Sequence, residues 1–397
     1  MKTKNTRRIL VALLILPAFM ASITNCSGIP LPTTFYRNGL DCIRIYDGKV
    51  FTGTQFKLDT FTYETNFSIY SLAENLSMEL LDTIDIGTTF EDIEIIDGYC
   101  FLALGSFGGG FGYGFAIIDY TDPNTLDYAY RHDYDSYVYD VEISGNIAWL
   151  SMNGHLITLD VTSKNSPVQL HDTSTEAREC HILGNQVLLC RVINSIELLN
   201  VSVPAAPVLI NNITNPYYNP ISIEVVGNYA IIPFCSNILG NYSKILKIYD
   251  LTIPTSPEIV ASINAPGDDW QNFRDLMVFD DLMFYEIQDD NIEIYNISDI
   301  QDPQHYGRID TRSLIKGDDY FLGHYSYFNG SFYVSFTGEL TSSWDDIYST
   351  ILIHPLADVL VKAAIPGYDV CLIGGLIVTT TFILWKAKRR ARIGKST

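Results

Sequence analysis

The chain has 397 residues, of which 47% are hydrophobic and 13% aromatic, and this composition excludes a largely disordered or fibrous protein. Its 26 tyrosines and 20 phenylalanines favour β-strands over helices. Ten of the 25 basic residues lie in two short terminal tails, so 15 remain between the tails against all 46 acidic residues. So acidic a body repels nucleic acid and favours cations or basic partners.

The first segment has the composition of a secretory signal peptide. Basic residues among the first eight positions precede the apolar run 9–23, which is the order of regions in such a peptide. We therefore expect residues 1–27 to be a signal peptide, with a short membrane span as the alternative. Cys26 resembles a lipoprotein acceptor only loosely, because Asn25 stands where a small residue is usual.

A hairpin pattern then recurs along the chain. In its clearest copy, VEISGNIAWL at residues 141–150, two apolar-alternating runs flank Gly145-Asn146. The turns of the seven copies begin at Asp47, Asp97, Gly145, Gly184, Gly227, Asp280 and Asn329. The repeat of roughly 47 residues is the length of a four-stranded propeller blade.

A second pattern follows most of the hairpins. A third apolar run ends in Asp or Asn before a turn that often contains proline, as in LDVTSKNSP from Leu159 and YDLTIPTSP from Tyr249. The Asp or Asn side chain can accept backbone hydrogen bonds in the turn, and proline stops the strand from continuing. A fourth run then completes the blade. The sequence therefore predicts an all-β fold, a seven-bladed β-propeller of four-stranded blades over residues 28–365.

These motifs resemble the LVIVD-repeat family of bacterial and archaeal surface propellers, in which an innermost strand of the type DVxVxGNYAYV precedes a turn of the type VVDVSNPxxP. DVEISGNIAWL from Asp140 and IEVVGNYAII from Ile223 are similar to the first motif, and LDVTSKNSP is similar to the second. The resemblance covers about residues 40–360. It implies a fold and no chemistry. The strand that closes the ring is expected from DVLVKAAI at Asp358 or from PTTFYRN near Pro32.

The far end of the chain has the pattern of a membrane anchor. Residues 370–385 are uncharged, and the following KAKRRARIGK stays in the cytoplasm by the positive-inside rule. We expect a transmembrane anchor over residues 366–385 and a cytoplasmic tail over 386–397, with a buried core helix as the alternative. The propeller would then face outward at the cell membrane. IPGYD from Ile365 resembles archaeal sorting signals of the PGF type, with Tyr368 in place of Phe.

One residue at the start of each innermost strand is a candidate site residue. These positions, five before each turn, are Cys42, Asp92, Asp140, Glu179, Ser222, Asp275 and His324. Innermost strands line the central channel of a propeller, so the seven residues would ring one of its mouths. Asp92, Asp140, Glu179, Asp275 and His324 could hold Ca²⁺ or another hard cation, which prefers several oxygen ligands. The alternative is structural, with the acids accepting backbone hydrogen bonds.

Three acidic segments beside aromatic residues are candidate ligand-binding loops. They contain Asp268, Asp269, Trp270, Asp318, Asp319, Tyr320 and Trp344. Aromatic platforms next to carboxylates suit sugars or cationic ligands, although solvated loop acids are the alternative.

Possible covalent modifications are less specific. Candidate glycosylation sites in Asn-x-Ser/Thr tripeptides are Asn66, Asn75, Asn200, Asn212, Asn241 and Asn296. Cys180 and Cys190 flank one hairpin turn, so a diagonal cross-strand bridge is one interpretation and two buried apolar residues is the other.

No motif for catalysis is present in the sequence. We therefore expect a binding or interaction module at the cell surface rather than an enzyme, with no certain cofactor and with an extracellular protein or glycan as partner. The alternative is a propeller enzyme, such as a carbohydrate-active hydrolase or lyase, that uses two carboxylates of the channel mouth as acid and base. A purely structural envelope component is a third possibility.

Overall fold

The computed structural model describes the repeat region with gaps between its strands. The described residues are 29–35, 43–57, 63–73, 78–105, 112–184, 186–192, 194–215, 219–235, 244–264, 273–279, 281–287, 291–310, 327–329, 332–340 and 347–355. Every regular element among them is a β-strand, which confirms the all-β prediction. In this part of the chain no helix is long and apolar enough to cross a membrane. The predicted signal peptide and membrane anchor lie outside it.

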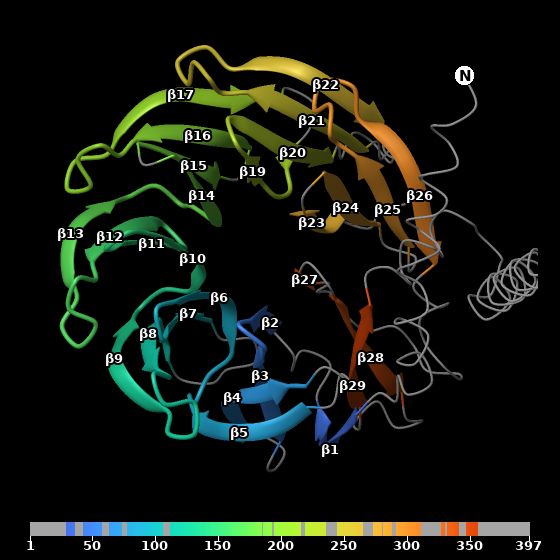
Figure 1. Ribbon diagram of the computed structural model, residues 1–397. Coiled ribbons are helices and arrows are strands. Elements are labelled where there is room, and N and C mark those ends of the chain that lie inside the picture. Colours follow the sequence, from blue (N-terminus) through green and yellow to red (C-terminus); the bar gives the residue numbers. More distant parts are fainter. Residues whose placement is uncertain are drawn as a thin grey trace, which may run out of the picture.

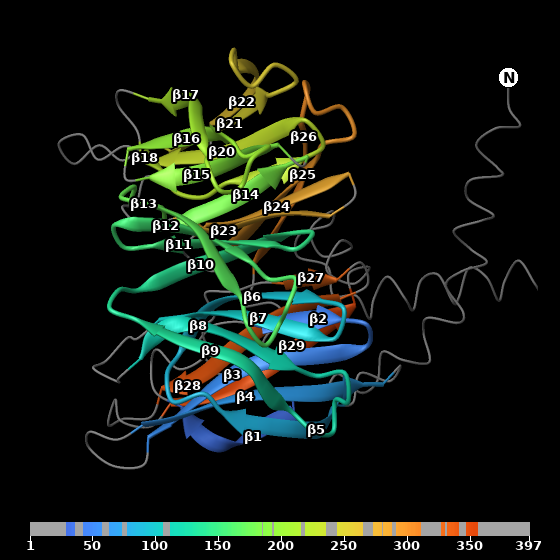
Figure 2. The same cartoon turned by 90° about the vertical axis from the view of Figure 1, so that its left-hand side faces the viewer.

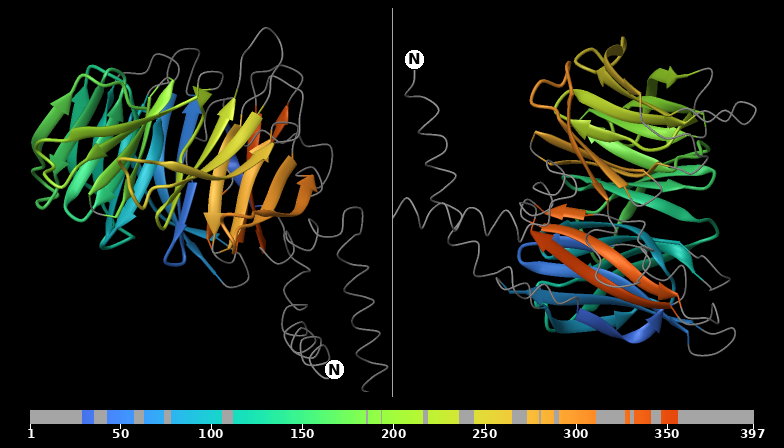
Figure 3. Two further views of the ribbon diagram at one scale, coloured as in Figure 1. Left: turned by 90° about the horizontal axis from the view of Figure 1, so that it is seen from above. Right: turned by 90° about the vertical axis from the view of Figure 1, so that its right-hand side faces the viewer.

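The strands form antiparallel sheets arranged around a common centre (Figure 1). Figures 2 and 3 show from other sides that successive sheets stack face to face around the ring. In chain order from residue 43, the first strands are β2 (Ile43–Tyr46), β3 (Lys49–Lys57), β4 (Tyr63–Leu72) and β5 (Met78–Asp85), which belong to an eight-stranded sheet; β6 (Phe90–Ile96), β7 (Tyr99–Leu104), β8 (Tyr113–Asp119) and β9 (Asp127–Tyr134), which form a four-stranded sheet; and β10 (Val138–Ser144), β11 (Ile147–Met152), β12 (His155–Asp160) and β13 (Val168–Thr173), which form another.

The later sheets follow the same order. They consist of β14 (Glu179–Leu183), β15 (Val187–Val192), β16 (Ser195–Asn200) and β17 (Val208–Thr214); β18 (Asn219–Pro220) and β19 (Glu224–Val226), which both pair with β20 (Tyr229–Cys235), then β21 (Lys244–Asp250) and β22 (Glu258–Asn264); and β23 (Phe273–Phe279), β24 (Leu282–Ile287), β25 (Asn291–Asn296) and β26 (Gln304–Asp310). The last strands are β27 (Tyr327–Asn329), β28 (Phe332–Leu340) and β29 (Ile347–Pro355), which belong to the same eight-stranded sheet as β2–β5.

The innermost hairpins follow the turn chemistry of their residues. Asp47 and Gly48 both have positive φ angles, of 47° and 65°, as a type I′ turn requires at both central positions. Gly145 alone has a positive φ, of 60°, in the turn between β10 and β11, which is the pattern of a type II′ turn. The predicted Gly145-Asn146 hairpin is thereby confirmed.

The predicted Asp or Asn turns are also present. In each, an Oδ1 atom accepts a hydrogen bond from the backbone N–H two residues later, at 2.8–3.0 Å. The five side chains are Asp119, Asp160, Asn200, Asp250 and Asn296. They begin the turn that leads to the outermost strand of a sheet, and prolines such as Pro167 stand just before that strand.

The hydrophobic core lies between sheets rather than at the centre of the ring. The middle strands, such as β7 and β11, are buried on both faces, whereas the outer strands β9 and β13 contain only exposed and half-buried residues. In one core cluster, Phe67 from β4 packs with Phe90 from β6. In the next, Phe101 from β7 packs with Val141 from β10. Each sheet is therefore held by the faces of its two neighbours, which leaves the innermost strands free to carry polar residues.

The two ends of the repeat region meet in one sheet. Strand β1 (Ile29–Phe35) pairs antiparallel with β29, next to β28 and β27 (Figure 1). A single bridge between Phe35 and Phe56 of β3 joins this group of strands to β2–β5. Of the two segments expected to close the ring, the segment near Pro32 therefore supplies the strand. The segment from Asp358 lies outside the described residues.

We predict that β1 carries much of the stability of the ring. Replacing residues 29–35 with a Gly/Ser segment of equal length should lower the free energy of unfolding by roughly 3 kcal/mol or more, because it removes the partner of β29 and the bridge to β3. Denaturant unfolding of the purified chain measures this change. The same replacement over residues 358–364 is the control and should have a smaller effect. Equal effects, or a larger effect of the control, would contradict closure by β1.

Candidate functional site

The acids at the start of the innermost strands connect neighbouring sheets. The carboxylates of Asp92, Asp140 and Glu179 accept hydrogen bonds from backbone N–H groups of the next innermost strand. The donors are Val141 N at 3.4 Å, Cys180 N at 2.9 Å and Ile223 N at 3.1 Å, respectively. Each donor directly follows the matching ring position of its own sheet. Such contacts are expected if these acids have a structural role, in which they accept backbone hydrogen bonds.

The calcium hypothesis stays a prediction. Within the described residues, no group of three or more His, Cys, Asp or Glu side chains is arranged to hold a metal ion. Two of the proposed ligands are not covered, since the side chain of Asp275 and the whole of His324 lie outside the described part.

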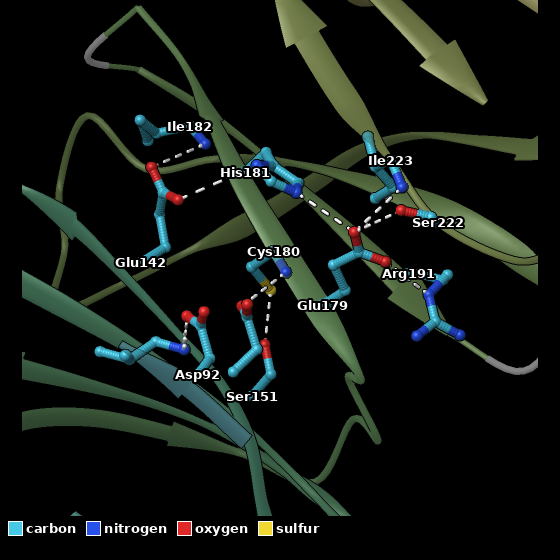
Figure 4. A network of polar contacts seen from close by, with 12 residues as sticks. Asp92, Glu142, Ser151, Glu179, Cys180, His181, Ile182, Arg191, Ser222 and Ile223 are labelled. Carbon is cyan, nitrogen blue, oxygen red and sulfur yellow. Dashed lines mark hydrogen bonds and ion pairs between the residues drawn. The ribbon is translucent and has the colours of Figure 1, made fainter. Parts of the chain in front are cut away.

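Among the ring positions whose side chains the structure describes, Glu179 forms the most contacts (Figure 4). Besides Ile223 N, its carboxylate accepts hydrogen bonds from Ser222 Oγ at 2.8 Å and Arg191 Nε at 2.8 Å, and it lies 3.3 Å from His181 Nε2. Burial by itself raises the pKa of Glu179, but the hydrogen bond with His181 and the charge of Arg191 lower that pKa to about 2. Its side chain remains 18% exposed, so the network reaches the surface that lines the centre of the ring.

A second layer of ionisable residues lies two positions further along the innermost strands. Alternate residues of a strand point to the same side, and these positions carry Arg44, Glu94, Glu142, His181 and Glu224. They come from β2, β6, β10, β14 and β19, respectively. We call these five residues the channel cluster.

The members of the channel cluster differ in their polar contacts. Arg44 forms an ion pair of 2.9 Å with Asp92. Glu142 accepts a hydrogen bond from Ile182 N at 3.4 Å and lies 4.0 Å from His181 (Figure 4). Glu94 and Glu224 are half-buried, and neither has a hydrogen-bond partner among the residues that the structure describes. These two carboxyl groups are therefore available to a ligand.

The members of the channel cluster influence one another across the centre of the ring. Burial, together with the charges of Asp92 and Glu142, raises the pKa of Glu94 to about 8 against the opposing charge of Arg44. Burial also raises the pKa of Glu224 to about 7, against the opposing charges of His181 and Arg44. Arg44 on β2 thus acts on carboxyl groups of both β6 and β19, which are not adjacent strands. The cluster can exchange protons near neutral pH or bind a cation in their place.

The other predicted ligand residues lie outside the described part of the chain, namely Asp268, Asp269, Trp270, Asp318, Asp319, Tyr320 and Trp344. A comparable group of aromatic and acidic side chains is present near the ring position of β10. Tyr137 packs against Tyr113 and Tyr139 with centroid distances of 5.9 and 4.7 Å, and its hydroxyl donates a hydrogen bond to Glu91. The guanidinium of Arg178 lies 5.7 Å from the centre of the Tyr139 ring.

Four of the six predicted glycosylation sites lie in the described residues. Asn66 is in β4, and Asn212 is exposed on the outer strand β17. Asn200 and Asn296 use Oδ1 in the turns described above, which leaves their Nδ2 atoms outside those hydrogen bonds. Asn75 and Asn241 are not covered by the described residues. Glycosylation stays a prediction for all six.

The sequence predicts the positions five residues before each turn, such as Asp92, but does not predict the channel cluster. The hairpin register aligns the repeats, so the position of Asp92 and Asp140 could be located. The same register shifted by two residues gives Glu94, Glu142 and Glu224. Because that position also carries Arg44 and His181, it has no common residue type that would single it out.

Replacement of Glu179 tests the connection between sheets. Glu179→Ala should lower the free energy of unfolding by roughly 3 kcal/mol, because it leaves Arg191 and the Ile223 N–H without their partner. The matched control is Glu176→Ala, which removes only the exposed pair with Arg178 and should change stability by about 0.5 kcal/mol or less. Both are measured by denaturant unfolding at pH 7. Equal effects of the two variants would contradict the role given to Glu179.

The channel cluster should make the protein less stable as pH rises from about 5 to about 9. The pKa of Glu94 is about 8 and that of Glu224 about 7 in the folded chain, against about 4.3 for an unfolded glutamate. Between these values the folded state holds protons that the unfolded chain has released, so the free energy of unfolding falls with rising pH. The raised pKa of His181 acts in the same direction above pH 6.5. Below pH 4 the lowered pKa of Glu179 reverses the trend.

Denaturant unfolding at pH 5, 7 and 9 measures this effect. We expect a fall of about 2 kcal/mol or more between pH 5 and 9. The double replacement Glu94→Gln and Glu224→Gln should flatten the profile, whereas Glu258→Gln on the outer strand β22 should not. A constant or rising free energy of unfolding over this range in the unmodified chain would contradict the assignment.

Comparison with known proteins bears on the fold. No protein-family model matches the sequence, and no curated protein is recognisably similar to it. Among solved structures, a protein from Lactobacillus plantarum has a TM-score of 0.55 at 11% identity, over 68% of this chain and 84% of that one. The computationally designed protein Ika8 has a TM-score of 0.50 at 8% identity, over 82% and 100%. Hsv2 from Kluyveromyces lactis has a TM-score of 0.50 at 9% identity, over 79% and 97%. At these identities the similarity shows the fold alone, which is that of a β-propeller.

Proposed function

We propose that this chain is a seven-bladed β-propeller of the LVIVD-repeat type that works as a binding module on the outside of the cell membrane. The blade count follows if β2–β5 form the first blade and β27–β29 with β1 form the seventh. A single bridge between Phe35 and Phe56 joins these two groups, whereas strands within each group pair over several residues. The module would be exported by the signal peptide at residues 1–27 and held by the anchor at residues 366–385.

The channel cluster is the binding site in this proposal. The observation that carries it is the presence of two carboxyl groups, on Glu94 and Glu224, that face the centre without a hydrogen-bond partner among the described residues. Burying a carboxyl group without a hydrogen-bond partner costs stability, and such groups are candidates for a ligand site. Both groups hold protons that a positively charged ligand can displace. The ligand class is therefore a cation, and we propose a protonated amine, carried by a protein or glycan outside the cell.

Amines suit this site better than a bare metal ion. A metal ion requires several oxygen ligands at short distance, and the described residues contain no such grouping. An ammonium group donates separate hydrogen bonds in different directions, so it can reach carboxyl groups on non-adjacent strands. The positive charge of Arg44 limits the net attraction and favours ligands that also carry an anionic or polar part.

The enzymatic alternative has one specific observation in its favour. The pKa of Glu94 is about 8 and that of Glu179 about 2, and acid and base carboxyl groups of hydrolases differ in this way. However, the carboxylate of Glu179 is already occupied by Arg191, Ser222 and Ile223 N, so it is poorly placed to act as a base. Hydrolysis of a glycan that is lost in Glu94→Gln would favour the enzyme.

Calorimetric titration of the purified full chain with spermidine, a compact polyamine, tests the binding proposal. We expect saturable binding at pH 7.5 with release of protons, seen as a heat that depends on the ionisation enthalpy of the buffer. The double variant Glu94→Gln and Glu224→Gln should bind roughly tenfold more weakly or worse, since it loses charge-assisted hydrogen bonds. The control Glu258→Gln should bind like the parent. No binding, or equal binding by the double variant, would refute the proposed site.

A further inference from the structure

The hairpin of β14 and β15 carries two cysteines that the proposed function does not use. Cys180 on β14 and Cys190 on β15 are directly opposite each other in the antiparallel register, rather than diagonal as the sequence suggested. Both are fully buried, and their Sγ atoms lie 2.8 Å apart. The pair packs in the core cluster between two sheets, beside Trp149 and Leu188.

This placement meets the geometric requirements of a disulfide bond. Opposite residues of antiparallel strands have Cα atoms about 4.5–5.5 Å apart, and disulfides span about 4.4–6.8 Å. The two sulfur atoms already face each other, so no backbone movement is needed to join them. Cys100 provides a contrast, because its opposite residues on β6 and β8 are Ile95 and Ile118.

We propose that Cys180 and Cys190 form a cross-strand disulfide bond in the exported protein. The oxidant is an external disulfide, either that of a thiol oxidoreductase or a small-molecule disulfide, as found in oxidising compartments. The thiolate of one cysteine attacks one sulfur of the donor disulfide, breaks the donor S–S bond and forms a mixed disulfide, and the other donor sulfur is released as a thiolate. The thiolate of the second cysteine then attacks the cysteine sulfur of the mixed disulfide and releases the second donor thiolate. The two cysteines are thereby oxidised by two electrons, the donor is reduced to two thiols, and the two cysteine protons pass to those thiols or to water.

The bond has to form before the sheets pack. In the folded chain both thiols are buried, and burial raises the pKa of the Cys180 thiol well above its usual value. Because an oxidant or a reductant has to reach the sulfur atoms, the burial of both residues in the folded chain shields the thiols from oxidants and, once joined, the disulfide from reductants. Oxidation therefore belongs to the stage at which the β14–β15 hairpin has formed but its neighbours have not yet covered it.

The disulfide would fix the strand pair that carries the Glu179 network. Glu179 and His181 flank Cys180, and Arg191 follows Cys190 on the opposite strand, where it pairs in register with Glu179. The backbone N–H of Cys180 also donates a hydrogen bond to Asp140 on the preceding sheet. Ser151 Oγ donates a hydrogen bond to Cys180 Sγ at 3.0 Å, and a disulfide sulfur can still accept it. The bond would thus hold one side of the channel wall rigid.

Peptide mapping without reduction tests the proposal. The full chain, produced through an oxidising export route, is denatured in the presence of N-ethylmaleimide, digested and examined by mass spectrometry. We expect a linked peptide pair containing Cys180 and Cys190, two hydrogens lighter than the free peptides, and an alkylated Cys100. Complete alkylation of both Cys180 and Cys190 would overturn the proposal.

Two further measurements test whether the two cysteines can form the bond, independently of whether the protein is exported. The proposal relies on export only as the source of the oxidant. Refolding the reduced full chain with a glutathione redox buffer should give the same linked peptides, and failure there would overturn the geometric argument even if export occurs. Reduction during unfolding should lower the melting temperature of the oxidised chain and of Cys100→Ala by a few degrees. It should leave the double variant Cys180→Ala and Cys190→Ala unchanged, and equal shifts in all three proteins would refute the bond.

Discussion

The hydrogen bond from a backbone N–H of one innermost strand to a carboxylate of the preceding one is the contact on which the centre of this protein depends. The hydrophobic clusters hold the sheets together farther out, but apolar packing alone does not fix the height at which neighbouring sheets meet. Asp92, Asp140 and Glu179 fix it, because each accepts a directional bond from the strand beside it. Because the bond recurs between neighbouring innermost strands, it also fixes the position along the channel axis of the remaining side chains of these strands, including the channel cluster.

The same arrangement brings together charges that would otherwise stay apart. The strands that carry Glu94, Glu142 and Glu224 converge at the centre of the ring, and burial, together with the charges of nearby carboxylates, raises the pKa of each residue. Arg44 and His181 offset part of this cost. The apolar packing between the sheets offsets the rest of the free-energy cost of burying these carboxyl groups. Many proteins have ligand sites that are less stable than their surroundings in this way.

The parts of the fold that could be predicted depend mainly on interactions between residues close together in the sequence. Asp-Gly and Gly-Asn pairs determine their own turn geometry, and the Asp and Asn side chains at the ends of third strands bond to the next few backbone groups. Both effects act within a few residues, so the sequence contains them in readable form. The positions of Asp92, Asp140 and Glu179 followed from the register of those turns. Partners across the ring did not, since nothing near Glu94 in the sequence reveals that Arg44 and His181 will face it. The choice between two closing segments also depended on contacts between distant parts of the chain.

Closure by β1 has a consequence for how the molecule is made. Of the described strands, β1 is synthesised first and pairs with β29, which is synthesised last, so the ring can be completed only after the other described strands exist. Pairing over so long a separation is slow, because the chain entropy of loop closure has to be overcome before any contact rewards it. Until then β29 presents an open edge that can also accept a strand from another copy of the chain. Exchange of β1 between two molecules is therefore the characteristic way in which this fold would misassemble.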